Sequence, residues 1–387
     1  MNPISWHILT GEYPPASGGV SDYTRQVAIK LAEAKEEVHV WTRGASTRTE
    51  LVDGVWIHRS LGEFRPKDLN ELGKQLVDPA KRATLLVQYV PHGFGMRAMN
   101  LPLAYWIDHQ ASKMGVDVRL MLHEVAFPFV RWPLHHNLIA IANRWMLRTI
   151  LKNPRHVYLS TTSWQPIVQR YSRRPLSTAC LPIPSNIPSE TQSNAKIFRS
   201  QLTGSDHDAI VVGHFGTFGG DIRNLTLETI HRLLKQSALV RFVLIGRGAA
   251  QAKEDVLCTI PADQSGRVLA VDNASEEDVA GWIQASDIML QPYPDGISTR
   301  RTSAMAGLAN DVAVVSNHGA LSETFWRDLN AVSLAESPNV DQLTQKTLEL
   351  VQSARLRKSF ADRGLATYQE KFSIQYTIEV LLKDIEL

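Results

Sequence analysis

The chain alternates between short apolar runs and longer amphipathic stretches, and this alternation limits it to few folds. Its first run, ISWHILT (4–10), is followed by a glycine-containing loop and then by helical apolar spacing over 20–34. Further β-branched runs, with helical patterns between them, predict strands at 38–42, 84–90, 118–124 and 156–161. Because parallel strands need long crossover connections, the alternation predicts a parallel sheet with helices on both faces.

The pattern breaks once and then starts again. The segment PIPSNIPSETQSN, within 182–207, is rich in Pro, Ser and Asn and predicts a linker. After it a strand (209–216), a glycine turn and a helix (222–235) repeat the opening of the chain. Further strands are predicted at 241–246, 267–272, 287–293 and 312–317, and helices at 338–353 and about 355–386.

We therefore predict an α/β protein of two Rossmann-like, doubly wound domains facing across a cleft. The first spans 1–187, the second spans 200–370, and a C-terminal helix at about 371–387 packs back on the first. In open α/β sheets ligands bind outside the carboxyl ends of the strands. Glycine turns there let backbone amides approach an anion, and helix N-termini favour negative charge, so we expect a phosphate-bearing ligand.

Composition excludes several classes of protein. The length of 387 residues suits two domains, and Cys180 and Cys258 lie too far apart for a disulfide framework or a C-x-x-C site. The N-terminus lacks the basic and apolar regions of a signal peptide, and no apolar run is long enough to cross a membrane. We expect a cytoplasmic location. Without H-E-x-x-H or C-x-x-C we predict no metal and no cofactor, and without G-x-G-x-x-G a nicotinamide dehydrogenase is disfavoured.

Charge is divided unevenly along the chain. Residues 1–185 hold 22 Lys or Arg against 14 Asp or Glu, and the rest holds 19 against 25. No acidic residue lies between Glu124 and Glu190, and Trp132, Trp145 and Trp164 lie among the arginines and lysines of this stretch. This stretch is a solvated basic face, a peripheral membrane contact through 131–155 at the inner face of a membrane, or a site for an anionic acceptor such as a lipid diphosphate. It matches no nucleic-acid module.

Four arginines stand beside glycine turns or predicted helix starts in the net acidic second half. Arg223 follows GHFGTFGGD and Arg247 lies within IGRG. Arg300 and Arg301 lie within YPDGISTRRTSAMAG (293–307), where we expect them in the first turn of a helix. Cations are unfavourable there by roughly 0.3–1 kcal/mol each, because the helix dipole is positive at that end. Each could form a surface salt bridge, but a bound diphosphate explains all four together.

Two motifs mark the first half. GGVSDYT (18–24) follows the first strand and forms either a turn with a capping acidic residue, Asp22, or a loop that closes over a substrate. His123 and Glu124 end a predicted strand, where the histidine is either structural or placed for a ligand.

Over nearly its whole length the chain resembles the GT-B glycosyltransferases, specifically the retaining glycosyltransferase family 4. TGEYPPASGGVSDYTRQVAIKLAEAKEEVHVWT is similar to the opening of that family, with its proline-rich stretch and Gly-Gly loop. QASDIMLQPYPDGIS (284–298) and SAMAGLANDVAVVSNHGA resemble the two halves of its signature. The family's two signature glutamates align with Asp295 and Ser303, so the second carboxylate is replaced by a hydroxyl.

The resemblance implies roles for individual residues. His123, Asp295 and Arg223, which best matches the family's lysine, are expected to be catalytic. Asp22, Tyr23 and Glu124 are expected to contact the acceptor. The residues expected to bind the sugar donor are Gly19, Val20, Gly216, Thr217, Arg247, Gly296, Ile297, Ser298, Thr299, Arg300, Arg301, Thr302 and Ser303.

The function implied is transfer of a sugar from a nucleotide diphosphate sugar to a glycan, lipid-linked or small-molecule acceptor. The resemblance favours a metal-independent hexosyl- or related transferase that retains anomeric configuration. Asp22 or Glu124 acting as a base would instead indicate inversion. Two alternatives stay open: a non-catalytic nucleotide-sugar-binding homologue, to which the altered signature points, and a nucleotide-sugar epimerase.

Overall fold

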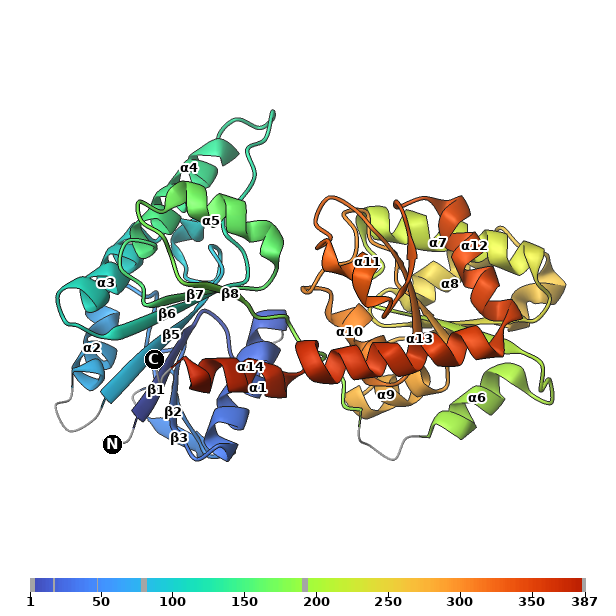
Figure 1. Ribbon diagram of the computed structural model, residues 1–387, viewed down its shortest axis with the longest axis horizontal. Coiled ribbons are helices and arrows are strands. Elements are labelled where there is room, and N and C mark those ends of the chain that lie inside the picture. The colour runs from blue at the N-terminus through green and yellow to red at the C-terminus, as the bar shows by residue number, and fades with distance from the viewer. Residues whose placement is uncertain (1–3, 17, 47, 78–81, 190–193, 385–387) are drawn as a thin grey trace. The chain divides into compact units, whose positions relative to one another are not determined.

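A computed structural model describes residues 4–16, 18–46, 48–77, 82–189 and 194–384. Its chain divides into two compact units, which Figure 1 shows as separate sheets with their helices. Unit 1 comprises Met1–Pro182 with Thr377–Leu387, and unit 2 comprises Ile183–Tyr376. The boundary therefore falls at the start of the predicted linker, four residues of which (190–193) lie outside the described residues.

Unit 1 is built on a sheet of eight strands within the described residues, in the order β3-β4-β2-β1-β5-β6-β7-β8. All neighbouring pairs are parallel except β3 with β4. The strands are β1 (Ile4–Thr10), β2 (Glu37–Trp41), β3 (Thr49–Val52), β4 (Val55–His58), β5 (Arg82–Tyr89), β6 (Asp117–Leu122), β7 (His156–Leu159) and β8 (Thr178–Cys180). The five strands predicted in this half are confirmed.

Helices cover both faces of this sheet (Figure 1). One face carries α2 (Asn70–Leu76), α3 (Leu101–Ser112), α4 (His136–Ile150) and α5 (Gln165–Tyr171), which share one apolar core with the strands. The other face carries α1 (Gly19–Glu33) and α14 (Ile374–Lys383). Central strands such as β1 and β5 are buried almost throughout, because helices cover both of their faces.

Unit 2 has a wholly parallel sheet in the order β11-β10-β9-β12-β13-β14. Its strands are β9 (Ile210–Phe215), β10 (Val240–Ile245), β11 (Val268–Val271), β12 (Ile288–Leu290), β13 (Ala313–Asn317) and β14 (Ser333–Ala335). One apolar core joins the sheet to α6 (Ala195–Thr203), α9 (Glu276–Gln284), α10 (Thr302–Ala309) and α11 (Phe325–Leu329). A second core joins its other face to α7 (Gly220–Gln236), α8 (Ala249–Leu257) and α12 (Val340–Gln352). The predicted doubly wound α/β architecture is thus confirmed in each unit.

Several features differ from the sequence predictions, among them the short strands β8 and β14, which were not predicted. The β3–β4 hairpin turns at Asp53 and Gly54, which both have positive φ, and the sequence pattern had not indicated it. The helix predicted over about 355–386 is interrupted: α13 (Ala354–Thr367) runs into a π-helical turn, Tyr368–Phe372, before α14 begins. Arg300 and Arg301 are not in a first helical turn, because α10 begins at Thr302 with Arg301 as its N-cap residue.

The C-terminal helix is tied to the unit 1 sheet by one buried arginine. Arg119 of β6 forms an ion pair with Asp117 at 2.9 Å and donates to the backbone carbonyls of Leu381 and Asp384, each at 3.1 Å. Tyr158 of β7 donates to the Asp384 carboxylate at 2.9 Å. The end of the chain is therefore an integral part of unit 1.

We expect Arg119→Met to lower the free energy of unfolding by about 3 kcal/mol, because it leaves a buried carboxylate and two carbonyls without their donor. Urea unfolding followed by circular dichroism measures the loss, and hydrogen exchange should quicken in α14. Arg155→Met, at an exposed position beside β7, is the matched control and should change little. An Arg119 variant as stable as the control would contradict this account of how α14 is held.

Candidate functional site

The loop that follows β12 is fastened to the end of β13 by an asparagine. Asn317 accepts from the Tyr293 amide at 2.9 Å and donates to the Tyr293 carbonyl at 2.7 Å. Its own carbonyl accepts from the Ile297 amide at 2.8 Å. Both ends of the turn at 293–297 are therefore fixed to one residue at the carboxyl edge of the sheet.

Two glycines bring this loop against the segment that follows β13. Gly296 has φ 89°, and a Cβ there would lie 2.3 Å from the Gly319 nitrogen. A Cβ on Gly319 would lie 2.5 Å from the Gly296 nitrogen. The Leu321 amide donates to the Asp295 carbonyl at 2.8 Å. Glycine is needed at both positions because the two backbones touch.

A buried carboxylate holds the far end of the loop. Glu323 is 3% exposed and accepts from the Thr299 hydroxyl at 2.6 Å and the Thr299 amide at 3.2 Å. It also accepts from the Trp326 indole at 2.8 Å. Sequence analysis missed this residue, because its role depends on a partner 24 positions away.

A compact polar cluster lies where this loop meets α10. Arg301 forms an ion pair with Asp295, and its guanidinium lies 4.5 Å from the centre of the Tyr293 ring. The Tyr293 hydroxyl is hydrogen-bonded to Ser303 Oγ at 2.8 Å. Burial raises the pKa of Tyr293 to about 12, although the Ser303 hydrogen bond and the Arg301 charge oppose the rise. The phenol is therefore neutral, and the cluster places Asp295, Arg301 and Ser303 together.

The glycine turn after β9 reaches the same cluster. A Cβ built on Gly216 would lie 4.0 Å from Ser303 Oγ and 3.9 Å from His214 Nε2. The turn also needs Gly246, because a Cβ there would lie 2.3 Å from the Gly216 carbonyl oxygen. Gly216 and Ser303, predicted from separate motifs, are thus neighbours.

His214 is a member of the cluster that sequence analysis did not select. The residue is 2% exposed, and its Nδ1 donates to the Leu290 carbonyl at 2.8 Å, which leaves Nε2 as an acceptor. Among the described residues Nε2 has no hydrogen-bond partner. Burial lowers the pKa of His214 to about 4, so the imidazole is neutral at ordinary pH.

The other two predicted arginines differ from Arg301 in their surroundings. Arg223 forms an ion pair with Asp255 of α8, which is the structural role that sequence analysis had left open. Arg247 is exposed and belongs to no ion pair among the described residues. The start of α8 beside it already holds a protein carboxylate: Asp272 accepts from the amides of Gly248, Ala249 and Ala250 at 2.8–3.2 Å.

The remaining residues predicted to bind the sugar donor vary in access. Ile297, Ser298 and Thr299 are almost fully buried. The amides of Gly296 and Ile297 donate to the carbonyls of Tyr293 and Asn317. Thr217 is exposed, and Arg300 and Thr302 are half-buried.

In unit 1 His123 follows β6 and meets side chains of β5 and α1. His123 is buried, its Nε2 lies 2.8 Å from Gln88 Oε1, and its ring meets the Tyr23 ring edge-on at 5.0 Å. Burial raises the pKa of Tyr23, partly opposed by a hydrogen bond with Thr377. Glu124 lies 3.7 Å from His92 Nδ1.

The start of α1 is capped by a residue that sequence analysis did not choose. Glu12 accepts from the Ser21 amide at 3.2 Å, and a Cβ on Gly18 would lie 2.4 Å from its carboxylate. Asp22 lies in the first turn of the helix, and Gly19 and Val20 precede it. Glu12 therefore supplies an acidic cap that sequence analysis did not predict.

Within the described residues, no group of three or more His, Cys, Asp or Glu is arranged to hold a metal ion. No helix in this part of the chain is long and apolar enough to span a bilayer.

Comparison with known proteins supports the fold and leaves the family open. No protein-family profile and no curated sequence matches the chain. Sucrose-phosphate synthase from Thermosynechococcus elongatus has a similar structure, with a TM-score of 0.68 and 16% identity over 99% of both chains. WaaG, a glycosyltransferase of lipopolysaccharide biosynthesis, has a TM-score of 0.63 and 14% sequence identity over 97% of this chain and 99% of its own. Anabaena HepE in complex with UDP and glucose has a TM-score of 0.65 and 12% sequence identity over 99% of both chains. At such identities the likeness shows the fold: two Rossmann-like units, as in GT-B glycosyltransferases.

The pKa of His214 makes stability depend on pH. The neutral form is favoured in the folded state, since its pKa falls from the ordinary 6.5 to about 4. The neutral imidazole therefore makes its full contribution to the free energy of unfolding above pH 6.5. As the pH falls toward 4, that free energy decreases by up to about 3 kcal/mol.

His58 of unit 1 has a pKa lowered by burial to about 4 as well, so the measurement must be differential. We expect the stability difference between the wild type and His214→Asn in urea to shrink from neutral pH toward pH 4. Asparagine retains a donor for the Leu290 carbonyl. If the free energies of unfolding of the two proteins change with pH in parallel, His214 does not titrate as its burial requires.

Proposed function

We propose that the protein transfers a sugar from a nucleotide diphosphate sugar to an acceptor, as a retaining enzyme akin to glycosyltransferase family 4. The observation that carries the proposal is the cluster of Asp295, Arg301, Tyr293, Ser303 and His214 beside the Gly216 turn. It lies at the carboxyl ends of β9 and β12, where open α/β sheets bind ligands. The sequence resemblance and the fold of solved glycosyltransferases support the same conclusion.

The two partners of the ion pair, Arg301 and Asp295, suit the two parts of such a donor, its diphosphate and its sugar. Phosphate oxygens can replace the carboxylate at the guanidinium, because its planar fork suits both groups. Sugar hydroxyls can then donate to Asp295. Arg300, the neighbouring cation, adds to the attraction for a leaving diphosphate, whose developing charge is the main quantity to stabilise in this chemistry.

Neutral groups take the place of the family's second glutamate. Ser303, the Tyr293 hydroxyl and His214 Nε2 offer two hydroxyls and one imidazole acceptor at the Gly216 turn. We assign the nucleoside hydroxyls to this neutral face. The half-buried Thr302 and the exposed Thr217 and Arg247 are assigned to its rim, and Arg223 to an indirect role through α7 and Asp255.

The acceptor is assigned to unit 1, with Asp22, Tyr23 and Glu124 as its contacts and His123 as the group for the transferred sugar. No metal is invoked, since guanidinium groups supply the charge for the diphosphate. UDP, present in the HepE structures, is the nucleotide to test first.

We expect Arg301→Ala to weaken binding of UDP by about tenfold or more, because charge-assisted hydrogen bonds contribute about 1.5–3 kcal/mol. Isothermal titration calorimetry measures the change. Arg232→Ala is the matched control, since Arg232 lies on α7 paired with Asp341. The double variant Asp295→Asn with Arg301→Ala distinguishes two causes of weaker binding. One is the lost attraction between Arg301 and UDP, and the other is repulsion of UDP by an Asp295 that has lost its partner. Unchanged affinity in both variants would refute the diphosphate role.

We expect the product to keep the anomeric configuration of the sugar donor. Slow hydrolysis of UDP-glucose, followed by proton NMR before mutarotation, should release the α-anomer first. Release of the β-anomer would overturn retention and direct attention to Asp22 or Glu124 as a base. Tight donor binding without turnover across acceptors would instead support the non-catalytic homologue, which the replacement of the second glutamate by Ser303 favours.

A further inference from the structure

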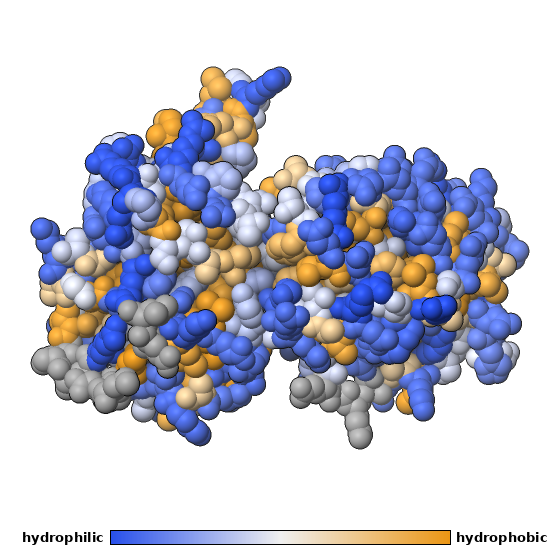
Figure 2. Space-filling model, in the orientation of Figure 1, coloured by the Kyte–Doolittle hydropathy of each residue, from blue (hydrophilic) through white to orange (hydrophobic). Residues whose placement is uncertain are grey.

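Unit 1 presents a row of large apolar side chains on α4, on the loop before it and on α3. Each of them is between 48% and 81% exposed. We call this row the apolar ridge, and its members are Tyr105, Phe129, Trp132, Leu134, Leu138, Ile141 and Trp145. Figure 2 shows hydrophobic atoms gathered over α4 and the loop that precedes it.

Helix α4 is apolar on two faces. Met146 and Leu147 point into the unit 1 core, while Leu138, Ile141 and Trp145 follow helical spacing on the exposed side. A surface helix needs only one apolar face to dock on its own domain. The second face is a contiguous exposed patch of the kind that marks a contact with a partner or a membrane.

The exposure of the ridge is built into the structure of the loop. Asn137 accepts from the Val130 amide at 2.8 Å and donates to the Val130 carbonyl at 2.9 Å. Arg144 donates to the Phe127 carbonyl at 2.8 Å and lies 3.9 Å from the centre of the Phe129 ring. These contacts fix the loop on α4, so Phe129 and its neighbours are held outward by the fold.

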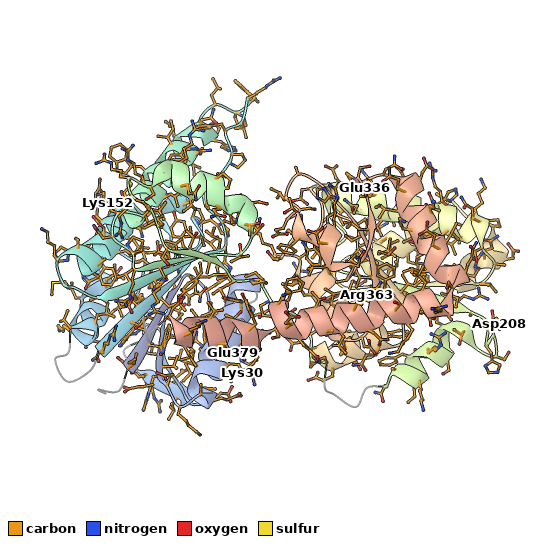
Figure 3. The ribbon with its side chains drawn as sticks, in the orientation of Figure 1. Lys30, Lys152, Asp208, Glu336, Arg363 and Glu379 are labelled. Carbon is orange, nitrogen blue, oxygen red and sulfur yellow. The ribbon has the colours of Figure 1, made fainter. Side chains whose placement is uncertain are left out.

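The charges around the ridge select one occupant. Arg131 and Arg148 are exposed beside it, and the sequence has no acidic residue between Glu124 and Glu190. Lys152, labelled in Figure 3, lies against α3, where its charge meets Asp108 at 3.4 Å. A second copy docked ridge to ridge would bring these arginines against each other. An anionic lipid surface satisfies both the apolar and the basic groups.

We propose that the apolar ridge inserts into the surface of a membrane that contains anionic lipid. Tryptophan side chains prefer the boundary between headgroups and acyl chains, and Trp132 and Trp145 lie along the ridge. An amphipathic helix with flanking arginines lies in the plane of such a surface. The proposal concerns attachment of unit 1 and does not depend on the transferase activity.

The test is cosedimentation of the full-length protein with vesicles, without nucleotide or acceptor. We expect binding to vesicles of equal parts phosphatidylglycerol and phosphatidylcholine at low salt, and weaker binding as salt screens the charges. Trp132→Ser with Leu138→Gln should lower the partition coefficient by about tenfold or more. Arg131→Gln with Arg148→Gln should remove the preference over pure phosphatidylcholine. Ile197→Gln, at an exposed apolar residue of α6, is the control and should bind as the wild type does.

Three outcomes would overturn the proposal. One is no sedimentation with anionic vesicles at low salt. The second is equal binding by the ridge variant and the Ile197 control. The third is a concentration-dependent dimer that the Leu138 substitution abolishes, which would assign the ridge to a second copy of the chain. Thermal unfolding of each variant distinguishes these outcomes from a failure to fold, because all substitutions lie at exposed positions.

Discussion

The backbone contact between Gly296 and Gly319 is the constraint on which the unit 2 site depends. It brings the loop after β12 and the segment after β13 within touching distance, closer than any side chain allows. Asn317 then fixes the start of the loop and Glu323 fixes its end. The position of Asp295 follows from these contacts, because its carbonyl accepts from Leu321 while its side chain pairs with Arg301. A polar cluster held in this way is presented to a ligand with little further ordering, which lowers the entropic cost of binding.

The same structure shows why a glycine turn before a helix does not by itself make an anion site. At α1 and α8 the protein supplies its own anion, Glu12 in one unit and Asp272 in the other. Helix α10 is different, since the residue at its N-cap position is a cation, Arg301. The positive charge of Arg301 is unfavourable at a helix N-terminus, but Asp295 and the face of the Tyr293 ring stabilise it. The arginine therefore stays close to the positive end of the helix without being stabilised by it.

Local patterns predicted the central strands well, because a central parallel strand is buried on both faces and is rich in apolar residues. They missed the β3–β4 hairpin: β3 is exposed along its length, so no alternation of burial marks it, although Asp53-Gly54 is a turn signal. They placed Asp295 and Ser303 in one site because a single short motif carries both. Glu323 and the pairing of Arg223 with Asp255 escaped because each depends on a partner that only the folded chain brings near. Sequence spacing along one segment is informative, whereas contacts between segments require the structure.

A serine at position 303, where the family that the sequence resembles has a glutamate, changes the charge of this cluster. A glutamate there would add a negative charge beside Tyr293 and compete with phosphate for the nearby guanidinium groups. Ser303 instead hydrogen-bonds a phenol with a pKa of about 12, next to an imidazole with a pKa of about 4. Between these values the Ser303, Tyr293 and His214 face stays uncharged, so its hydrogen-bonding pattern does not change with pH. Under the proposed function such a face would discriminate by the placement of hydroxyl groups, and the charge that holds a diphosphate would come from the arginines.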